Sequence, residues 1–176
     1  MKPIKLHFLW LLLLGALALP AEAQQLAFPE AQGWGRFATG GRKGTVYHVT
    51  NLNDSGTGSL RDAISQPNRI IVFDVAGVIY INSRLIFSKN LYVAGQTAPG
   101  EGITVYGDGV SFSGADNLIV RYMRFRMGAV GSKDKDCAGI ANGQNMISTI
   151  ARLLGDKTRT SPSTGIIRVL LPRISR

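Results

Sequence analysis

Short apolar runs, separated by glycines and polar turns, follow one another through the middle of this chain. Valine, isoleucine and aromatic residues dominate these runs, and helical periodicity is nearly absent from them. A pattern of this kind is typical of β-strands. The predicted strands lie within TVYHVTNL (45–52), RIIVFDV (69–75), GVIYI (77–81), NLYVAG (90–95), ITVYG (103–107), VSFSG (110–114) and NLIVRYMRFRMG (117–128).

The segment SLRDAIS (59–65) departs from the strand pattern. Ser59 precedes an apolar position, and Asp62 follows three residues later, which is the arrangement of a helix N-cap. We therefore predict one short helix near residues 59–65.

An internal repeat is carried by asparagine. Asn90, Asn117 and Asn145 recur at spacings of 27 and 28 residues, and each precedes an apolar residue that begins a predicted strand. A period of this length, with several short strands in each repeat, favours a parallel β-helix. Asparagine tolerates left-handed backbone at turns, and stacked asparagines can hydrogen-bond along a ladder. The alternative is an antiparallel sandwich in which the spacing arose by chance.

The first 23 residues have the organisation of a secretory signal peptide. Lys2 and Lys5 form a basic start, a short apolar core follows, and Ala21–Ala23 resembles a cleavage site. The apolar run is shorter than the ~20 residues that a membrane helix needs. We expect a secreted protein, extracellular or periplasmic, with no stable membrane span after cleavage. An uncleaved anchor is the alternative.

Cysteine and histidine are scarce, which excludes several kinds of site. Cys137 is the sole cysteine, so the chain has no intramolecular disulfide. His48 is the sole histidine beyond the expected signal peptide, and its alternating surroundings favour a strand residue over a catalyst. Histidine-based triads and histidine-rich zinc sites are therefore not expected.

Four blocks carry a resemblance to a known family: AFPEAQGWGRFATGGRKGTVYHVTNLNDSGTGSLRDAISQPNRIIVFDVAGVI (27–79), NLYVAGQTAPGEGI (90–103), NLIVRYMRFRMG (117–128) and DCAGIANGQNMI (136–147). Together they resemble the N-terminal portion of secreted bacterial pectate-lyase-like proteins of polysaccharide lyase family 1, which are right-handed parallel β-helices. The resemblance implies eliminative cleavage of acidic pectic polysaccharide, usually with calcium, by an enzyme that uses an arginine as its base. We also expect the folded chain to be a monomer.

Candidate site residues follow from this resemblance and from the strand pattern. Asp134 and Asp136 lie near the position of an acidic calcium ligand of the family, although a solvated charged loop is the alternative. Arg124 and Arg126 share one face of a predicted strand, with Arg121 on the other. That pair is suited to holding substrate carboxylates, or it simply solubilises the sheet face. No catalytic arginine can be assigned within residues 27–147.

The net charge of +9 is concentrated near the end of the sequence. Residues 24–147 carry a net +3, whereas residues 148–176 carry +5 and lose the repeat. The family continues at this point with a Phe-Asp-His and Trp-Gly type stretch. The same nucleotides, read one base out of phase, can encode such a stretch, so we interpret residues 148–176 as a frameshift product. A genuine basic tail is the alternative, but it lacks the interleaved aromatic residues of a nucleic-acid-binding segment, so we expect no nucleic acid partner.

The sequence thus predicts three segments: a signal peptide at 1–23, a lyase-like β-helix at 24–147 and an unrelated basic tail at 148–176. A truncated β-helix of about four coils without a C-terminal cap would expose strand edges and dissolve poorly. We expect an inactive remnant of a calcium-dependent pectate lyase. The rival interpretation is a secreted β-helix module for carbohydrate binding or surface adhesion.

Overall fold

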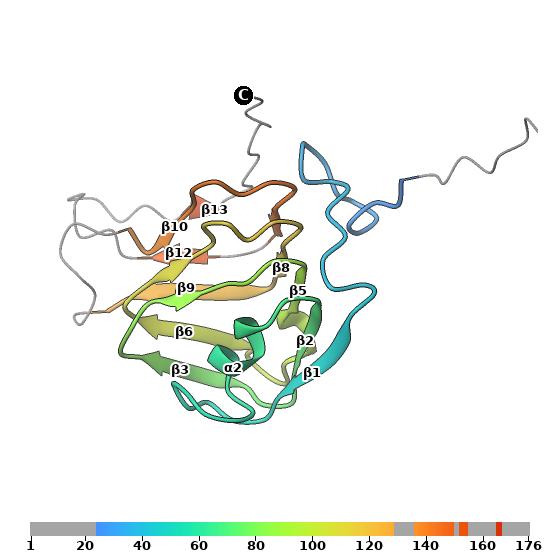
Figure 1. Ribbon diagram of the computed structural model, residues 1–176. Coiled ribbons are helices and arrows are strands. Elements are labelled where there is room, and N and C mark those ends of the chain that lie inside the picture. The colour runs from blue at the N-terminus through green and yellow to red at the C-terminus, as the bar shows by residue number, and fades with distance from the viewer. Residues whose placement is uncertain (1–23, 129–135, 150–151, 155–164, 167–176) are drawn as a thin grey trace, which may run out of the picture.

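The computed structural model describes residues 24–128, 136–149, 152–154 and 165–166. Over these residues the chain winds into a solenoid of about four turns in which successive coils stack their strands in parallel (Figure 1). Helix is almost absent. The fold is a right-handed parallel β-helix, which confirms the predicted fold class.

Three sheets run along the solenoid. Neighbouring strands pair in parallel throughout, except that β12 and β13 are antiparallel. Sheet A contains β1 (Thr45–Val49), β2 (Arg69–Phe73), β5 (Leu91–Ala94), β8 (Ile119–Arg121) and β11 (Ile147–Thr149). Sheet B contains β3 (Gly77–Ile81), β6 (Ile103–Gly107), β9 (Met123–Met127), β12 (Arg152–Leu154) and β13 (Gly165–Ile166). Sheet C contains β4 (Leu85–Ile86), β7 (Val110–Ser111) and β10 (Ala138–Gly139).

The core lies inside the coils, where equivalent residues of successive coils stack. In sheet B, for example, the inward residues Ile79, Val105 and Phe125 are paired in register and are almost completely buried. This alternation of inward and outward side chains is what the sequence pattern predicts for half-buried strands. Phe125 also makes an edge-on contact with Phe87, with 6.4 Å between the ring centroids. A continuous apolar core therefore supports all three sheets.

The asparagine repeat forms the predicted ladder. Asn68, Asn90 and Asn117 each lie at a turn with a left-handed backbone, with φ of 60°, 55° and 53°. Nδ2 of Asn117 donates to Oδ1 of Asn90 at 3.1 Å, and Nδ2 of Asn90 donates to Oδ1 of Asn68 at 2.9 Å. Asn145 has the same backbone conformation, with φ of 52°. The left-handed turn is confirmed at Asn90, Asn117 and Asn145, and the side-chain ladder is confirmed between Asn90 and Asn117.

The predicted helix is α2 (Leu60–Ser65). Ser59 is its N-cap, and its hydroxyl accepts a hydrogen bond from the backbone N–H of Asp62 at 3.2 Å. Leu60, Ala63 and Ile64 are buried and join the core beside β1, β2 and β4. The helix thus packs against the first coil. A single 3₁₀ turn, η1 (Gly95–Thr97), follows β5.

We name the N-terminal segment, residues 24–44, the strap. It runs along the length of the solenoid, crosses successive coils and covers the outside of sheet A before the chain enters β1 (Figure 1). Its glycines allow very close approach: a Cβ at Gly44 would lie 1.7 Å from the carbonyl oxygen of Asn68, and one at Gly35 would lie 2.1 Å from that of Met146. The strap also buries apolar side chains against outward residues of sheet A. This second apolar cluster contains Ala27, Phe28, Ala31, Ala38, Ile119 and Ile147, with Tyr92 packed beside it.

Two features differ from the predicted strand layout. Sheet C is built from strands of two residues, of which only the one within 110–114 was predicted. In addition, β11 runs through the expected boundary at residue 147, and β12 pairs in parallel with β9. The expected signal peptide lies outside the described residues. Among the described residues, no helix is both long and apolar enough to span a membrane.

Candidate functional site

The outer face of sheet B gathers the polar and aromatic side chains of three successive coils. Because side chains alternate along a strand, the residues between the core positions point outward, and among them Thr104 is covered and only 9% exposed. Two rows result, each following the register of the sheet. We name this surface the arginine–tyrosine face, and its members are Val78, Thr104 and Arg124 in one row and Tyr80, Tyr106 and Arg126 in the other.

Tyr80 and Tyr106 form an exposed aromatic pair on this face. Tyr80 is 65% exposed and Tyr106 is 38% exposed, and their rings meet edge to face with 5.7 Å between centroids. The ring of Tyr106 lies against Gly128, where a Cβ would come within 2.7 Å of Cε1. Exposed tyrosines present an apolar ring and a hydroxyl together. This combination suits a sugar, which has apolar C–H faces and hydroxyl edges.

The two predicted arginines lie on this face, but in different states. Arg124 is half-buried: Nε donates to Oγ1 of Thr104 at 2.9 Å, and Nη2 donates to the carbonyl oxygen of Glu101. Arg126 is exposed and has no partner among the described residues. Arg124 is therefore held in place, whereas Arg126 is available to a ligand. The sequence pattern placed both on one face and gave no sign of this difference.

Arg121 belongs to another sheet rather than to the opposite face of the same strand. The apolar run 117–128 is interrupted at Tyr122, whose φ of 57° turns the chain from β8 into β9. The Arg121 guanidinium stacks on the ring of Phe28 in the strap, 4.3 Å from its centroid. A left-handed tyrosine is rare, so the sequence carried no signal of this corner.

The predicted acidic pair is only partly within the described residues. Asp134 lies outside them, and Asp136 is exposed. The backbone carbonyl of Asp136 accepts a hydrogen bond from Nη2 of Arg84. Among the described residues, no group of three or more His, Cys, Asp or Glu side chains is placed to hold a metal ion. Metal ligation by Asp134 and Asp136 stays a prediction.

Arg84 is a residue that sequence reasoning missed. It lies in the turn between sheets B and C of an early coil and reaches Asp136, which is 52 positions later in the chain. The carbonyl oxygen of Arg84 itself accepts a hydrogen bond from Nη1 of Arg61 at 3.1 Å. These contacts fasten the segment that leads to β10 onto the first coils. Contacts between turns of different coils join residues that are far apart in the sequence, so no local motif predicts them.

Comparison with known proteins places this arrangement in context. No family model matches the chain. The chain is 64% identical over 122 residues to the probable pectate lyase C of Aspergillus oryzae and 62% identical over 122 residues to that of Emericella nidulans. Each match covers 69% of this chain and 29% of the relative, so the chain spans less than a third of the length of these relatives.

A plant relative and a solved structure extend the comparison. Probable pectate lyase 4 of Arabidopsis thaliana is 38% identical over 73 residues, which is 39% of this chain and 20% of that protein. The crystal structure of Jun a 1, the major allergen from cedar pollen, superposes with a TM-score of 0.54. That match has 19% identity and covers 68% of this chain and 40% of Jun a 1, so it supports the fold alone. These relatives are fungal and plant proteins, and the bacterial origin suggested by the resemblance stays a prediction. The chain is a pectate-lyase-like β-helix protein.

Proposed function

We propose that this protein acts on acidic pectic polysaccharide as a pectate-lyase-like polysaccharide lyase, with the arginine–tyrosine face as its substrate-binding surface. The observation that carries the proposal is the row formed by Tyr80, Tyr106 and Arg126 beside the anchored Arg124. High identity to proteins named pectate lyase supports it, over the part of the chain that matches. The activity of the whole enzyme is part of the proposal.

The side chains of this face have distinct roles in the proposal. Arg126 pairs with a uronate carboxylate, because its planar guanidinium can donate two parallel hydrogen bonds to the two carboxylate oxygens. Arg124 adds a fixed positive charge beside it, since Thr104 and the Glu101 carbonyl already orient its side chain. Tyr80 and Tyr106 contact the sugar rings of the neighbouring residues of the polysaccharide.

This binding also favours the chemistry of elimination. Cleavage of a uronate chain by β-elimination removes the proton alpha to the carboxylate, so negative charge develops next to a group that is already anionic. Positive charge fixed near that carboxylate stabilises the developing anion. The base that takes the proton is expected to be an arginine, and none of the described arginines is assigned that role.

Calcium remains a proposal. The resemblance is consistent with a calcium cofactor, and Asp134 and Asp136 would be its first candidates. Calcium takes about six to eight oxygen ligands. The described residues do not fit such a site by themselves, because the exposed carboxylate of Asp136 is not joined by two further acidic side chains. No step of the chemistry above depends on the ion.

We also propose that the protein is secreted and that it is a monomer. The predicted signal peptide at 1–23 and the pectic substrate both favour export, since pectic polysaccharides lie outside the cell. The experiment for localisation is N-terminal sequencing of the exported protein, with Gln24 expected as its first residue. An N-terminus at Met1 on membrane-bound protein would instead support the uncleaved anchor.

The test of function uses polygalacturonate with the full chain, in buffers with and without calcium. Ultraviolet absorbance of the unsaturated product reports elimination, and binding is measured in parallel. We expect Arg126→Gln to weaken binding about three- to tenfold, because it removes a charged hydrogen-bonding group. Lys89→Gln is the matched control, since Lys89 is an exposed cation away from this face.

The outcomes separate the rival functions. Product formation that falls in Arg126→Gln but not in Lys89→Gln supports a lyase. Binding with the same dependence on Arg126, but without product, supports the carbohydrate-binding or adhesion module. Equal behaviour of wild type and Arg126→Gln contradicts the assignment of this face.

We also propose that residues 148–176 arise from a shifted reading frame. The matched length of 122 residues is close to that of the expected lyase-like segment, 24–147. Reading the nucleotide sequence across codons 140–176 in all three frames tests this. A shifted frame that continues with a Phe-Asp-His and Trp-Gly type stretch supports the proposal. Its absence would establish the basic tail as genuine.

A further inference from the structure

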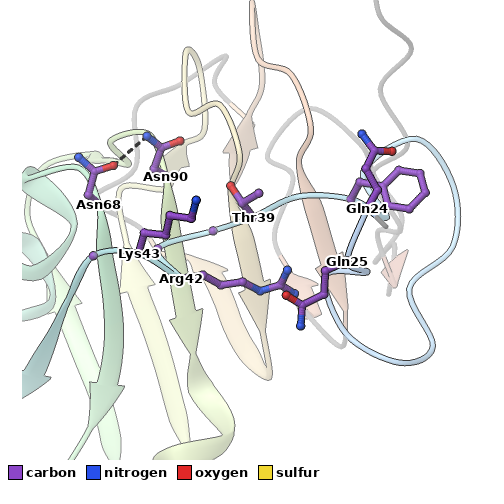
Figure 2. Close-up of a pocket in the computed structure, with 11 residues that line it drawn as sticks. Gln24, Gln25, Thr39, Arg42, Lys43, Asn68 and Asn90 are labelled. Carbon is purple, nitrogen blue, oxygen red and sulfur yellow. Dashed lines mark hydrogen bonds between the residues drawn. The ribbon is translucent and has the colours of Figure 1, made fainter. Parts of the chain in front are cut away.

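A hollow lies apart from the arginine–tyrosine face, where the strap passes the asparagine ladder. Its volume is about 750 Å³, which is within the range of sites for small organic ligands. Figure 2 shows its polar side chains in a row, from Gln24 and Gln25 past Thr39 and Lys43 to Asn90 and Asn68. We name this hollow the strap groove, and it is lined by Gln24, Gln25, Phe37, Thr39, Gly40, Gly41, Arg42, Lys43, Gly44, Asn68 and Asn90.

The charge of the strap groove is positive only. Lys43 is exposed and has no partner among the described residues, and its side chain extends toward the space between Asn90 and Thr39 (Figure 2). Arg42 is anchored, because Nη2 donates to the carbonyl oxygens of Leu26 and Ala27. Among the residues that the structure describes, no aspartate or glutamate lines the groove. The groove therefore attracts an anion and lacks the acidic ligands that a cation needs.

The asparagine ladder ends at one side of the groove and leaves one amide donor there. Each Nδ2 donates toward the preceding coil, from Asn117 to Asn90 and from Asn90 to Asn68. The amide dipoles are therefore aligned, and the Nδ2 of Asn68 is the terminal donor. Within the described part of the chain, this group has no acceptor. An aligned row of hydrogen bonds polarises its members, so the donor at the end of the ladder favours an anionic acceptor.

We propose that the strap groove is a second binding site for an acidic oligosaccharide, such as a stretch of uronate residues. This inference rests on the proposed function for the identity of the ligand. Lys43 pairs with a carboxylate, while the amides and the Thr39 hydroxyl contact sugar hydroxyls. Phe37 offers a partly exposed ring, with the Arg36 guanidinium 4.6 Å from its centroid. The row of polar groups suits an extended chain better than a single inorganic ion.

The location of the groove gives it a role separate from catalysis. The strap packs over sheet A, whereas the arginine–tyrosine face belongs to sheet B. A polysaccharide bound in the groove thus leaves sheet B free for another segment. Two sites on one molecule raise the local concentration of polymer at each, so retention on a polysaccharide exceeds the affinity of either site.

The experiment titrates the full chain with trigalacturonate and follows the side-chain amide signals of asparagine by nuclear magnetic resonance. The signals of Asn68 and Asn90 are expected to shift. In Lys43→Glu the same shift should require about tenfold more ligand, since an attractive charge becomes repulsive. Lys89→Glu is the matched control, because this exposed lysine precedes Asn90 and does not line the groove. It should stay within about twofold of wild type.

The results discriminate among the alternatives. Unmoved Asn68 and Asn90 signals, or equal weakening in both lysine variants, overturn the proposal. A neutral trisaccharide, maltotriose, that shifts the signals at the same concentration overturns the acidic ligand. Arg126→Gln should leave the amide shifts unchanged. If these shifts persist while Arg126→Gln has no effect on polygalacturonate binding, the proposed function fails and the strap groove stands. If only the effect of Arg126 is seen, the strap groove fails and the proposed function stands.

Discussion

Asp54 and Asp74 each pair with a basic side chain, but the surroundings of the two pairs differ sharply. Nη2 of Arg61 lies 2.5 Å from Oδ1 of Asp54, and about a quarter of each side chain is exposed. The other oxygen of Asp54 accepts a hydrogen bond from the backbone N–H of Asn82 at 3.2 Å. His48 and Asp74 pair at 2.9 Å, but about half of each side chain is exposed. The first pair joins the loop before α2 to a later turn, whereas the second lies in solvent.

The Asp54 pair should therefore contribute to stability and to its pH dependence. Burial by itself raises the pKa of Asp54, but hydrogen bonds from Arg61 and from the Asn82 N–H outweigh it and hold the pKa below its ordinary value. A lowered folded-state pKa means that the contribution is complete above the ordinary pKa of aspartate and is lost as pH falls through the lowered one. We expect Asp54→Asn to lower the free energy of unfolding by about 1–2 kcal/mol at neutral pH, measured by urea denaturation.

The control is Asp74→Asn, which removes the exposed partner of His48 and should cost no more than about 0.5 kcal/mol. In strong acid the wild type and Asp54→Asn should converge, because Asp54 is then protonated in both the folded and the unfolded state. If both variants lost the same free energy of unfolding at neutral pH, the Asp54–Arg61 pair would contribute no more to stability than the exposed His48–Asp74 pair.

At the scale of strands and turns, the asparagine ladder is the clearest feature that holds successive coils together. Each asparagine both occupies a left-handed turn and hydrogen-bonds the next coil, so two effects are combined in one residue. Asn68 belongs to the ladder although its spacing to Asn90 is 22 residues rather than 27 or 28. The sequence shows the repeat only where successive coils have nearly the same length. The interval from Asn68 to Asn90 is shorter, so the repeat did not identify Asn68.

Substitution of Asn90 separates the two effects. Asn90→Gly retains the left-handed turn and loses the ladder bonds, so it should cost about 1 kcal/mol of the free energy of unfolding. Asn90→Ala loses the bonds and also strains the backbone, and should cost about 2–3 kcal/mol. Thermal or urea unfolding measures both. If glycine and alanine were equally destabilising, the φ of 55° at this position would have no energetic importance.

Across the whole molecule, the strap contacts several successive coils and ties them together. Gly44 contacts the turn before β2, Gly41 contacts the start of β2, and Gly35 contacts the turn before β11. A Cβ at Gly41 would lie 2.0 Å from the carbonyl oxygen of Arg69, which is backbone and cannot move aside easily. Close contacts of this kind account for Gly35, Gly41 and Gly44 of GWGRFATGGRKG.

We expect Gly41→Ala to lower the free energy of unfolding by about 2 kcal/mol or more, or to detach the strap and expose it to limited proteolysis. Gly139→Ala is the matched control, since neither glycine has a positive φ and the nearest atom to a Cβ at Gly139 is Nη2 of Arg84 at 3.9 Å. The control should change stability by at most about 0.5 kcal/mol. Similar effects in both variants would contradict the close packing of the strap.

The sequence by itself determined the features that depend on neighbouring residues. Apolar alternation specifies strands, Ser59 with Asp62 specifies the start of α2, and asparagine specifies left-handed turns, because each of these preferences acts within a few residues. The common face of Arg124 and Arg126 follows from the same two-residue period. These local signals were sufficient for the β-helix and for one row of candidate ligand contacts.

Only the tertiary structure decided which residues of different coils meet. Tyr80 pairs in register with Tyr106 after 26 residues, and Tyr106 pairs in register with Arg126 after 20. Because the coils differ in length, no fixed period in the sequence aligns these side chains. The corner at Tyr122, the anchoring of Arg124 and the path of the strap likewise depend on contacts between segments far apart in the chain. Both proposed binding surfaces therefore depend on coil stacking, which aligns side chains that are far apart in the sequence.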